Sequence, residues 1–200
     1  MLAEVAAEIP GTDGAHVLVA VDGVDGSGKT TFAGELAEEL RRRGRAVVVI
    51  HADQFLNLSE VRYRRGRHSP DGFWLDSYDY DALEREVLIP FGPGGDGRYR
   101  PAAVDPVLDV RVSPEQRQAA AGTVAVVEGL FLHRDRLAAR WDYSVFLDVP
   151  FAVSARRVAD RDGTPADPDD PRIRRYIEGQ RSYFRSCRPW LRATRVIDNT

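Results

Sequence analysis

Residues 16–31, HVLVAVDGVDGSGKTT, constrain the fold of this chain more than any other stretch. They begin with a short apolar run and then turn through glycines into a lysine and two threonines. Four of these residues fit the phosphate-loop pattern G-x-x-x-x-G-K-[ST], namely Gly23, Gly28, Lys29 and Thr30. Because the pattern needs a strand before the loop and a helix after it, the stretch predicts a strand–loop–helix unit of an α/β domain.

The residue types of the loop suit the phosphates of a nucleotide. Glycines let backbone N–H groups point at a phosphate without a Cβ in the way. Lys29 brings a compact positive charge to the β- and γ-phosphates, and the Thr30 hydroxyl is suited to ligating Mg²⁺. We therefore expect a nucleotide with Mg²⁺, bound by the following loop residues: Gly23, Asp25, Gly26, Ser27, Gly28, Lys29, Thr30 and Thr31.

The use of lysine in this chain supports the same interpretation. The sequence has 28 basic residues of the Lys and Arg types, and Lys29 is its only lysine. A chain that uses arginine everywhere else has lysine where a point-charge ammonium fits and a planar guanidinium would not. The alternative is a glycine-rich turn with no ligand.

Strand and helix patterns alternate along the rest of the chain. A continuous apolar run typical of a buried parallel strand occurs at 46–50, and strand patterns return at 123–127, 143–149 and 194–197. Helical spacing follows the phosphate loop up to Gly44 and returns at 80–89, 151–161 and 172–187. This alternation predicts a doubly wound, mostly parallel sheet flanked by helices, and 200 residues suit one domain, 1–200.

Two further segments have their own character. Residues 1–15 are expected to form a short helix and a turn at Pro10. Residues 90–106, rich in Gly and Pro, predict a surface excursion with a hairpin that carries Tyr99 and residues 107–112.

Charge and composition argue against several classes of protein. A formal net charge of −3 is unfavourable for general binding to nucleic acid or to a membrane surface. No apolar run approaches the roughly 18 residues of a membrane span, and the acidic start MLAEVAAEIP does not resemble a signal peptide. A single cysteine, Cys187, fits a reducing compartment. We expect a cytoplasmic protein with no nucleic-acid or membrane partner, and we leave open whether it forms a homo-oligomer.

Three features sort the nucleotide-binding classes. The guanine signature N-K-x-D is missing, since the chain has no second lysine. The run at 123–127 ends in Glu128-Gly129, whereas mechanical ATPases usually have an Asp-Glu pair there. Residues 156–171 combine an arginine-bearing helix with a proline-spaced polar segment, which indicates a closing lid at about 156–175. Together these features favour a small-molecule kinase.

At this point the chain resembles the uridine kinase family, which includes phosphoribulokinase and bacterial pantothenate kinase. GVDGSGKTT matches the glycine-rich loop of that family, HADQF resembles its Asp-x-Phe strand end, and VVEGLF resembles its Glu-Gly turn. DVPFAVSARRVADRD and RYIEGQRSYF are similar to its lid helix and the helix after it. The resemblance spans most of the chain. It implies a P-loop NTPase fold with a helical lid, and ATP-dependent transfer of a phosphoryl group to a primary hydroxyl.

The chain departs from the family where the acceptor binds. The substrate segment GFWLDSYDYDAL is nearer to that of pantothenate kinase, and the Tyr-Asp and His of the hairpin are reduced to Val104-Asp105. The resemblance implies the 5′-hydroxyl of uridine or cytidine as acceptor. Pantothenate, a sugar or a specialised metabolite is an alternative, and a non-catalytic nucleotide-binding regulator or switch NTPase is an alternative from another class.

Chemistry and resemblance together assign the catalytic roles. Asp53, at a strand end, is expected to act as the base for the acceptor hydroxyl or to hold Mg²⁺-bound water, unless it only caps a local turn. Glu128 is expected near Mg²⁺ or the substrate, unless it forms a structural ion pair. Arg157 and Arg161 are four residues apart, on one helix face, and are expected to clamp the transferred phosphoryl group, unless they only face solvent. One of Arg172, Arg174 and Arg175 is also expected to reach phosphate.

The acceptor side is expected to be aromatic and acidic. Flat side chains for stacking are Phe55, Trp74, Tyr78 and Tyr99, although aromatic residues are more often part of a core. Asp76 or Asp79 is expected to bind sugar hydroxyls. The arginine cluster at 62–67 is interpreted as a solvated or substrate-gating loop, since the acidic balance argues against nucleic acid.

Overall fold

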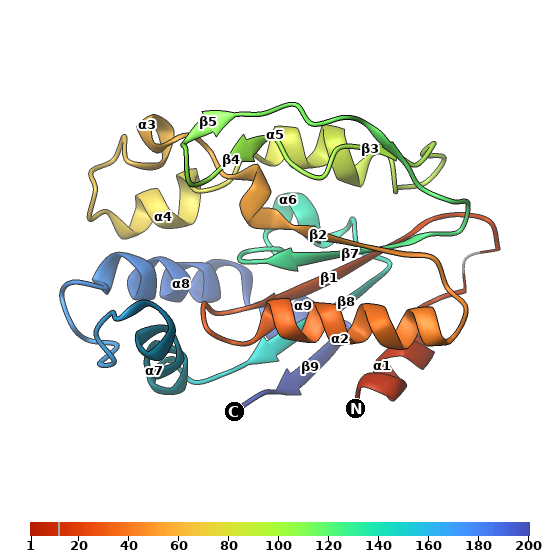
Figure 1. Ribbon diagram of the computed structural model, residues 1–200. Coiled ribbons are helices and arrows are strands. Elements are labelled where there is room, and N and C mark those ends of the chain that lie inside the picture. The colour runs from red at the N-terminus through yellow and green to blue at the C-terminus, as the bar shows by residue number, and fades with distance from the viewer. Residues whose placement is uncertain (12) are drawn as a thin grey trace.

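The computed structural model describes residues 1–11 and 13–200, and its centre is a five-stranded parallel sheet (Figure 1). The strand order is β2-β7-β1-β8-β9. The strands are β1 (Val17–Gly23), β2 (Val47–His51), β7 (Val124–Gly129), β8 (Tyr143–Asp148) and β9 (Arg195–Asp198). Every pair of neighbours runs parallel. The predicted α/β fold with a doubly wound parallel sheet is confirmed.

The two faces of the sheet pack into two separate cores, because side chains alternate along each strand. On β1, Leu18 and Ala20 belong to one core, and Val19 and Val21 belong to the other. All seven residues of β1 and all six of β7 are buried. Burial on both faces explains why these strands appear in the sequence as unbroken apolar runs.

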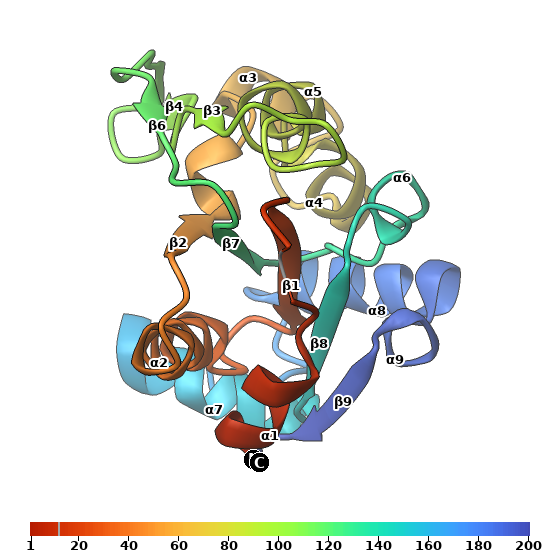
Figure 2. The same cartoon turned by 90° about the vertical axis from the view of Figure 1, so that its right-hand side faces the viewer.

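Helices cover both faces (Figure 2). The core that contains Val19 and Val21 is closed by α1 (Leu2–Glu8) and α2 (Lys29–Arg42), through residues such as Val5 and Leu36. The other core is closed by residues of α4 (Pro70–Asp76), α5 (Tyr80–Leu83), α6 (Asp135–Ala138) and α8 (Arg174–Cys187). The remaining α-helices are α3 (Ser59–Arg62), α7 (Phe151–Asp162) and α9 (Pro189–Arg192).

The segment between β2 and β7 is built from short elements. A 3₁₀ turn, η1 (Ala52–Phe55), follows β2, and α5 continues as a π-helical turn, η2 (Glu84–Leu88). The excursion expected after residue 90 forms two small antiparallel ladders. One pairs β3 (Arg98–Tyr99) with β6 (Arg117–Gln118), and the other pairs β4 (Val104–Asp105) with β5 (Val110–Arg111).

No helix within residues 1–11 and 13–200 is long and apolar enough to cross a membrane.

The last residue of β7, Gly129, passes so close to η1 that a side chain does not fit. A Cβ at this position would overlap the Cβ of Ala52. We expect Gly129→Ala to lower the free energy of unfolding by about 1–3 kcal/mol, the usual cost of overpacking, as measured by urea denaturation. Gly34→Ala in α2 is the control, since nothing lies within 4 Å of a Cβ there. It should leave stability unchanged or raise it by about 1 kcal/mol. Equal midpoints for Gly129→Ala and the wild type would contradict the close approach.

Candidate active site

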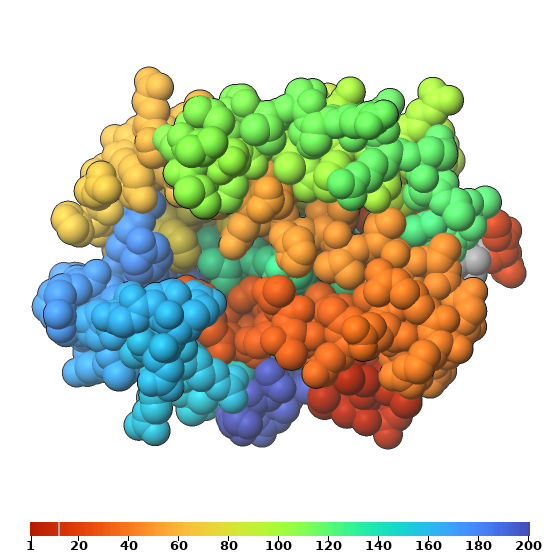
Figure 3. All heavy atoms as spheres, viewed as in Figure 1, coloured from red at the N-terminus to blue at the C-terminus, as the bar shows by residue number. Residues whose placement is uncertain are grey.

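A cleft of about 640 Å³ lies at the carboxyl end of the central strands. The phosphate loop leaves β1 there, and Glu128 of β7 lies in register with Val21 on one side and His51 on the other. Figure 3 shows the surface hollowed between α7, drawn in blue, and the yellow-to-green segments that follow β2. Ligands of open α/β sheets bind at this edge.

The phosphate loop has a backbone shape that needs glycine at two positions. Gly26 and Gly28 have φ values of 70° and 88°, in the left-handed region. A Cβ on Gly26 would lie 2.8 Å from the carbonyl oxygen of Ser154, and one on Gly28 would lie 2.9 Å from Nδ2 of Asn199. Helix α2 begins directly after Gly28, so its N-terminus faces the cleft-lining loop.

Lys29 folds back over this loop. Its Nζ donates a hydrogen bond of 2.8 Å to the carbonyl oxygen of Val24. Burial lowers the pKa of Lys29 below its ordinary value, and the negative charges of Asp25 and Glu128 oppose that shift. A desolvated ammonium gains from an added anion, and the phosphates of a nucleotide supply one.

Thr30, Glu128 and His51 form a connected polar group. The Thr30 hydroxyl donates to Oε1 of Glu128 at 3.2 Å, and Nδ1 of His51 lies 2.7 Å from the same oxygen. The hydrogen bond to Glu128 raises the pKa of His51. The oxygen donors of Thr30 and Glu128 fit Mg²⁺, which proteins usually hold through one or two oxygen side chains together with phosphate and water.

Asp53 and Tyr78 also meet in the cleft. Asp53 lies in η1, just after β2, and its Oδ1 accepts a 2.7 Å hydrogen bond from the hydroxyl of Tyr78. Burial, helped by the charge of Asp53, raises the pKa of Tyr78 well above its ordinary value. Tyr78 therefore stays protonated as a donor and orients the carboxylate. The sequence predicted both residues for the site, but it predicted stacking for Tyr78.

The two arginines expected on a lid, Arg157 and Arg161, line the cleft from α7. Arg157 donates to the carbonyl oxygen of Asn199 at 2.9 Å, and Arg161 pairs with Asp162 at 2.8 Å and with Asp25 at 3.4 Å. The helix is anchored to the phosphate loop, because the Ser154 hydroxyl donates to the carbonyl oxygen of Asp25 at 2.7 Å. Both guanidinium groups therefore lie beside the loop, held by protein groups.

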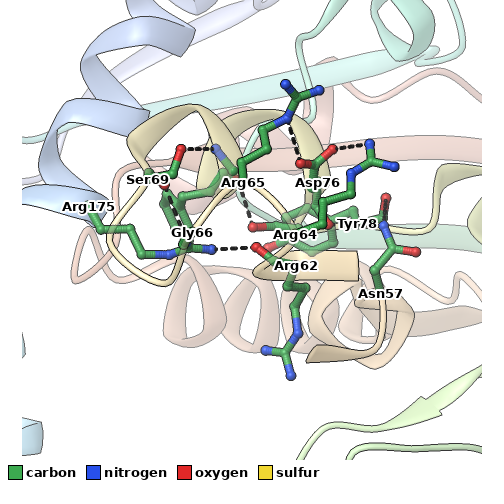
Figure 4. A network of polar contacts seen from close by, with 12 residues as sticks. Asn57, Arg62, Arg64, Arg65, Gly66, Ser69, Asp76, Tyr78 and Arg175 are labelled. Carbon is green, nitrogen blue, oxygen red and sulfur yellow. Dashed lines mark hydrogen bonds and ion pairs between the residues drawn. The ribbon is translucent and has the colours of Figure 1, made fainter. Parts of the chain in front are cut away.

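The three arginines after the lid have different surroundings. Arg172 pairs with Asp170 at 2.8 Å, and Arg174 is exposed and outside the cleft lining. Arg175 lines the cleft, but its guanidinium is buried and donates to backbone carbonyls of residues 62–69 (Figure 4). It therefore ties α8 to this loop.

The two carboxylates expected to bind sugar hydroxyls are engaged elsewhere, which corrects that prediction. Asp76 is 2 % exposed and pairs with Arg64 at 2.5 Å and with Arg65 at 2.8 Å (Figure 4). Burial alone would raise the pKa of Asp76, but these two bonds lower it. Asp79 caps α5 and accepts from Arg111 at 2.6 Å. Neither carboxylate lines the cleft.

The aromatic predictions need a similar correction. Phe55, Trp74 and Tyr99 are buried in the core that contains Leu18, and none of them lines the cleft. Tyr99 packs against Phe91 with ring centroids 5.1 Å apart. Helical or strand spacing does not distinguish an aromatic residue of the core from one that lines a cleft, because apolar side chains pack in both places.

Most of the predicted phosphate residues do face the cleft. Six of them line it: Asp25, Gly26, Gly28, Lys29, Thr30 and Thr31. Gly23 and Ser27 lie beneath the loop, where the N–H of Gly23 donates to Asp22 at 2.7 Å and the Ser27 side chain is buried.

The sequence did not identify the other wall of the cleft as a surface. This wall, here called the acceptor wall, consists of Leu56, Arg62, Tyr63, Phe73, Leu130 and Tyr176. The rings of Phe73 and Tyr176 pack edge to face at 5.0 Å. The signals in the sequence were the arginine cluster at 62–67 and the substrate segment GFWLDSYDYDAL, which contains Phe73. The other members come from segments far apart in the chain.

Comparison with known proteins gives a family match over most of the chain. The model of the family described as "Phosphoribulokinase / Uridine kinase family" matches residues 18–166. A thymidylate kinase from Xylella fastidiosa (strain M12) is 29 % identical over 159 residues, which are 74 % of this chain and 66 % of that protein. The aligned part thus spans just under two thirds of that relative.

Two solved structures share the fold over nearly the whole chain. A possible uridine kinase from Bacillus stearothermophilus has a TM-score of 0.76 and 22 % identity, covering 98 % of this chain and 95 % of the other. A candidate fructose transport system kinase from Silicibacter sp. TM1040 has a TM-score of 0.76 and 23 % identity, covering 98 % of both chains. At these identities the likeness concerns the fold.

Proposed function

The chain belongs to the phosphoribulokinase/uridine kinase family of kinases, and from this premise we propose that it transfers the γ-phosphoryl group of Mg·ATP to a hydroxyl of a small-molecule acceptor. One observation carries the proposal. The phosphate loop, with Lys29 and Thr30, lines the same cleft as Asp53, the carboxylate suited to an acceptor hydroxyl. A regulator that only binds nucleotide would not need the second group.

Positioning and charge neutralisation account for most of the catalysis in such a transfer. The loop N–H groups and Lys29 bind the phosphates, and Thr30 and Glu128 would hold Mg²⁺, which neutralises developing charge. Arg157 and Arg161 lie on the lid beside the loop, and we assign them the clamping of the transferred group.

Asp53 is the group that takes the proton of the acceptor. Tyr78 donates to one oxygen of its carboxylate, and no other side chain or backbone group donates to it within the part of the chain that the structure describes. The second oxygen is thus available to an acceptor hydroxyl. A hydrogen bond from this hydroxyl to the carboxylate would align it for attack and accept its proton.

The acceptor itself is the finer part of the proposal. Uridine and cytidine follow from the sequence resemblance, and the aromatic residues Tyr63, Phe73 and Tyr176 line the same cleft as Asp53. The carboxylates expected for the ribose, Asp76 and Asp79, are engaged elsewhere. We therefore test the reaction by ADP release from Mg·ATP against uridine, cytidine, other nucleosides, pantothenate and simple sugars. Tight nucleotide binding with no stimulation by any acceptor would favour the regulator.

Asp53→Asn is expected to lower kcat with the best acceptor by about 10²-fold or more, because asparagine cannot take a proton. The KM for ATP should change little, since Asp53 is not part of the phosphate loop. Steady-state ADP release measures both. Asp71→Asn, an exposed carboxylate on α4 outside the cleft, should leave both constants unchanged. A near-normal kcat for Asp53→Asn would remove Asp53 from the role of base.

A further inference from the structure

Cations outnumber carboxylates around the acceptor wall. Residues 62–69, here called the arginine loop, follow α3 and carry Arg62, Arg64, Arg65 and Arg67, and Arg175 is bound beneath them. Within residues 1–11 and 13–200, these five guanidinium groups form ion pairs with only two carboxylates. Asp76 pairs with Arg64 and Arg65, and Asp109 pairs with Arg62. The wall therefore has an excess of positive charge.

Arg175 is the most buried of these cations. Arg175 is 6 % exposed. Its guanidinium donates hydrogen bonds of 3.0–3.4 Å to four backbone carbonyl oxygens, those of Arg62, Gly66, Arg67 and Ser69 (Figure 4). None of these partners is charged, and its Nε has no partner in the described part of the chain. Burial lowers the pKa of Arg175. The guanidinium also lies over the rings of Tyr63 and Phe73, 4.9 and 5.8 Å from their centroids, but no carboxylate pairs with it in the described chain. Buried charges are normally paired, so this cation favours an anion in the cleft that it lines.

Arg62 has donors to offer to such an anion. Its NH2 group donates to Oδ1 of Asp109 at 2.8 Å, and Asp109 is held in turn by the backbone N–H of Ser59 at 2.9 Å. This pairing uses one nitrogen of the guanidinium. Within the described residues, Nε is buried without a partner and NH1 forms no hydrogen bond. In Figure 4 the Arg62 side chain points away from the carbonyl groups that Arg175 binds. It lines the cleft with its orientation set by Asp109.

The carboxylates that line the cleft leave this charge uncompensated. Asp25 pairs with Arg161, Glu128 bonds to His51 and Thr30, and Asp53 bonds to Tyr78. Since Asp76 and Asp79 do not line the cleft, the acceptor wall offers no carboxylate from residues 1–11 and 13–200 to the diol of a neutral sugar.

From these observations we infer that the acceptor is an anionic alcohol, whose hydroxyl reacts at Asp53 and whose carboxylate or phosphate group is bound by Arg62 in the field of Arg175. The inference rests on the proposed function and names its substrate class. A guanidinium fork matches both anions in geometry, so the shared chemistry is a planar or tetrahedral oxyanion.

The first test uses inorganic phosphate as the probe and does not depend on finding the true acceptor. The protein is saturated with Mg²⁺ and a non-hydrolysable ATP analogue, which fills the phosphate loop, and is titrated with phosphate by calorimetry. We expect one further phosphate to bind, with a Kd raised by about tenfold or more in Arg62→Gln, because charge-assisted hydrogen bonds are lost. Arg62→Lys keeps the charge, so its Kd for phosphate should lie between those of the wild type and Arg62→Gln.

The matched control is Arg174→Gln, which removes one positive charge next to Arg175 but from an exposed side chain that lies outside the cleft lining. It should bind phosphate as the wild type does. The affinity for the ATP analogue, measured in parallel, shows that each variant is folded. The inference is overturned if no second phosphate binds to the nucleotide-saturated protein, or if Arg174→Gln weakens binding as much as Arg62→Gln.

The second test is turnover with matched neutral and anionic acceptors. The pairs are glycerol with glycerate and glycerol with glycerol 3-phosphate, in which every member keeps a primary hydroxyl, and uridine serves as the neutral nucleoside. We expect a higher kcat/KM for the anionic member of each pair. The pair with the larger ratio of kcat/KM shows whether the site prefers a carboxylate or a phosphate. A higher kcat/KM for uridine than for both anions would overturn the inference while confirming a kinase. If no compound supports turnover, the proposed function is in question, whereas the calorimetric result still decides the anion site.

Discussion

Lys29→Ala is expected to lower kcat by about 10³-fold, because it removes the full positive charge that the phosphate loop directs at the transferred group. Nucleotide affinity should fall as well, since Nζ crosses the loop to within 2.8 Å of the Val24 carbonyl, where the phosphates are expected. Lys29→Arg is the sharper variant. It keeps the charge, but a planar guanidinium is wider than an ammonium, so we expect little recovery.

The lysine content of the chain offers an independent measurement. Since Lys29 is the only lysine, an amine-acylating reagent has just one side chain to modify. Burial lowers the pKa of Lys29, which leaves more of the reactive neutral amine. Mg·ATP should protect this amine from acylation, as followed by mass spectrometry of the Lys29 peptide, with the N-terminal amine as internal control. Equal modification with and without nucleotide would show that the phosphates do not cover Lys29.

Arg157→Ala and Arg161→Ala form the second large prediction. At least one of them should lower kcat on the order of 10³-fold, the effect of an arginine that stabilises the transferred phosphoryl group. In the structure Arg157 is held by the carbonyl oxygen of Asn199 and Arg161 by Asp25 and Asp162. These groups must release the guanidinium that moves to phosphate, so the expected loss is mainly in kcat, with a smaller change in the KM for ATP.

Arg156→Ala is the matched control for the lid. It lies on the same helix and carries the same charge, but it is exposed and does not line the cleft. It should keep a normal kcat, so a loss there would indicate damage to the helix. If both cleft-lining variants keep a normal kcat, α7 does not supply the phosphoryl clamp.

The parts of the site that were predictable are those that depend on local backbone geometry. The phosphate loop is a continuous segment, and left-handed φ values at Gly26 and Gly28 leave few residue types possible there. Asp53 and Glu128 were predictable because each lies at the end of an apolar run with strand pattern, and the carboxyl ends of parallel strands meet at one edge. Short-range pattern and topology were enough for these residues.

The acceptor side was not predictable in the same way. Asp76 and Asp79 stand in a segment that resembles a substrate motif, yet each carboxylate is taken by arginines. Whether a carboxylate faces a ligand or a guanidinium depends on which cations the fold brings near it. The positions of the aromatic residues were unpredictable for a similar reason, since flat apolar side chains pack both in the core and on the cleft wall.

The sequence by itself determined the strand–loop–helix with the phosphate-loop pattern, the parallel sheet and the strand ends near which Asp53 and Glu128 lie, because these follow from local geometry and from hydrophobic periodicity. Only the tertiary structure decided the acceptor wall. Arg175 reaches the arginine loop across more than 100 residues of chain, and Asp109 reaches Arg62 across 47. Contacts between such distant segments form only when the chain is folded, and they set which charges remain for a ligand.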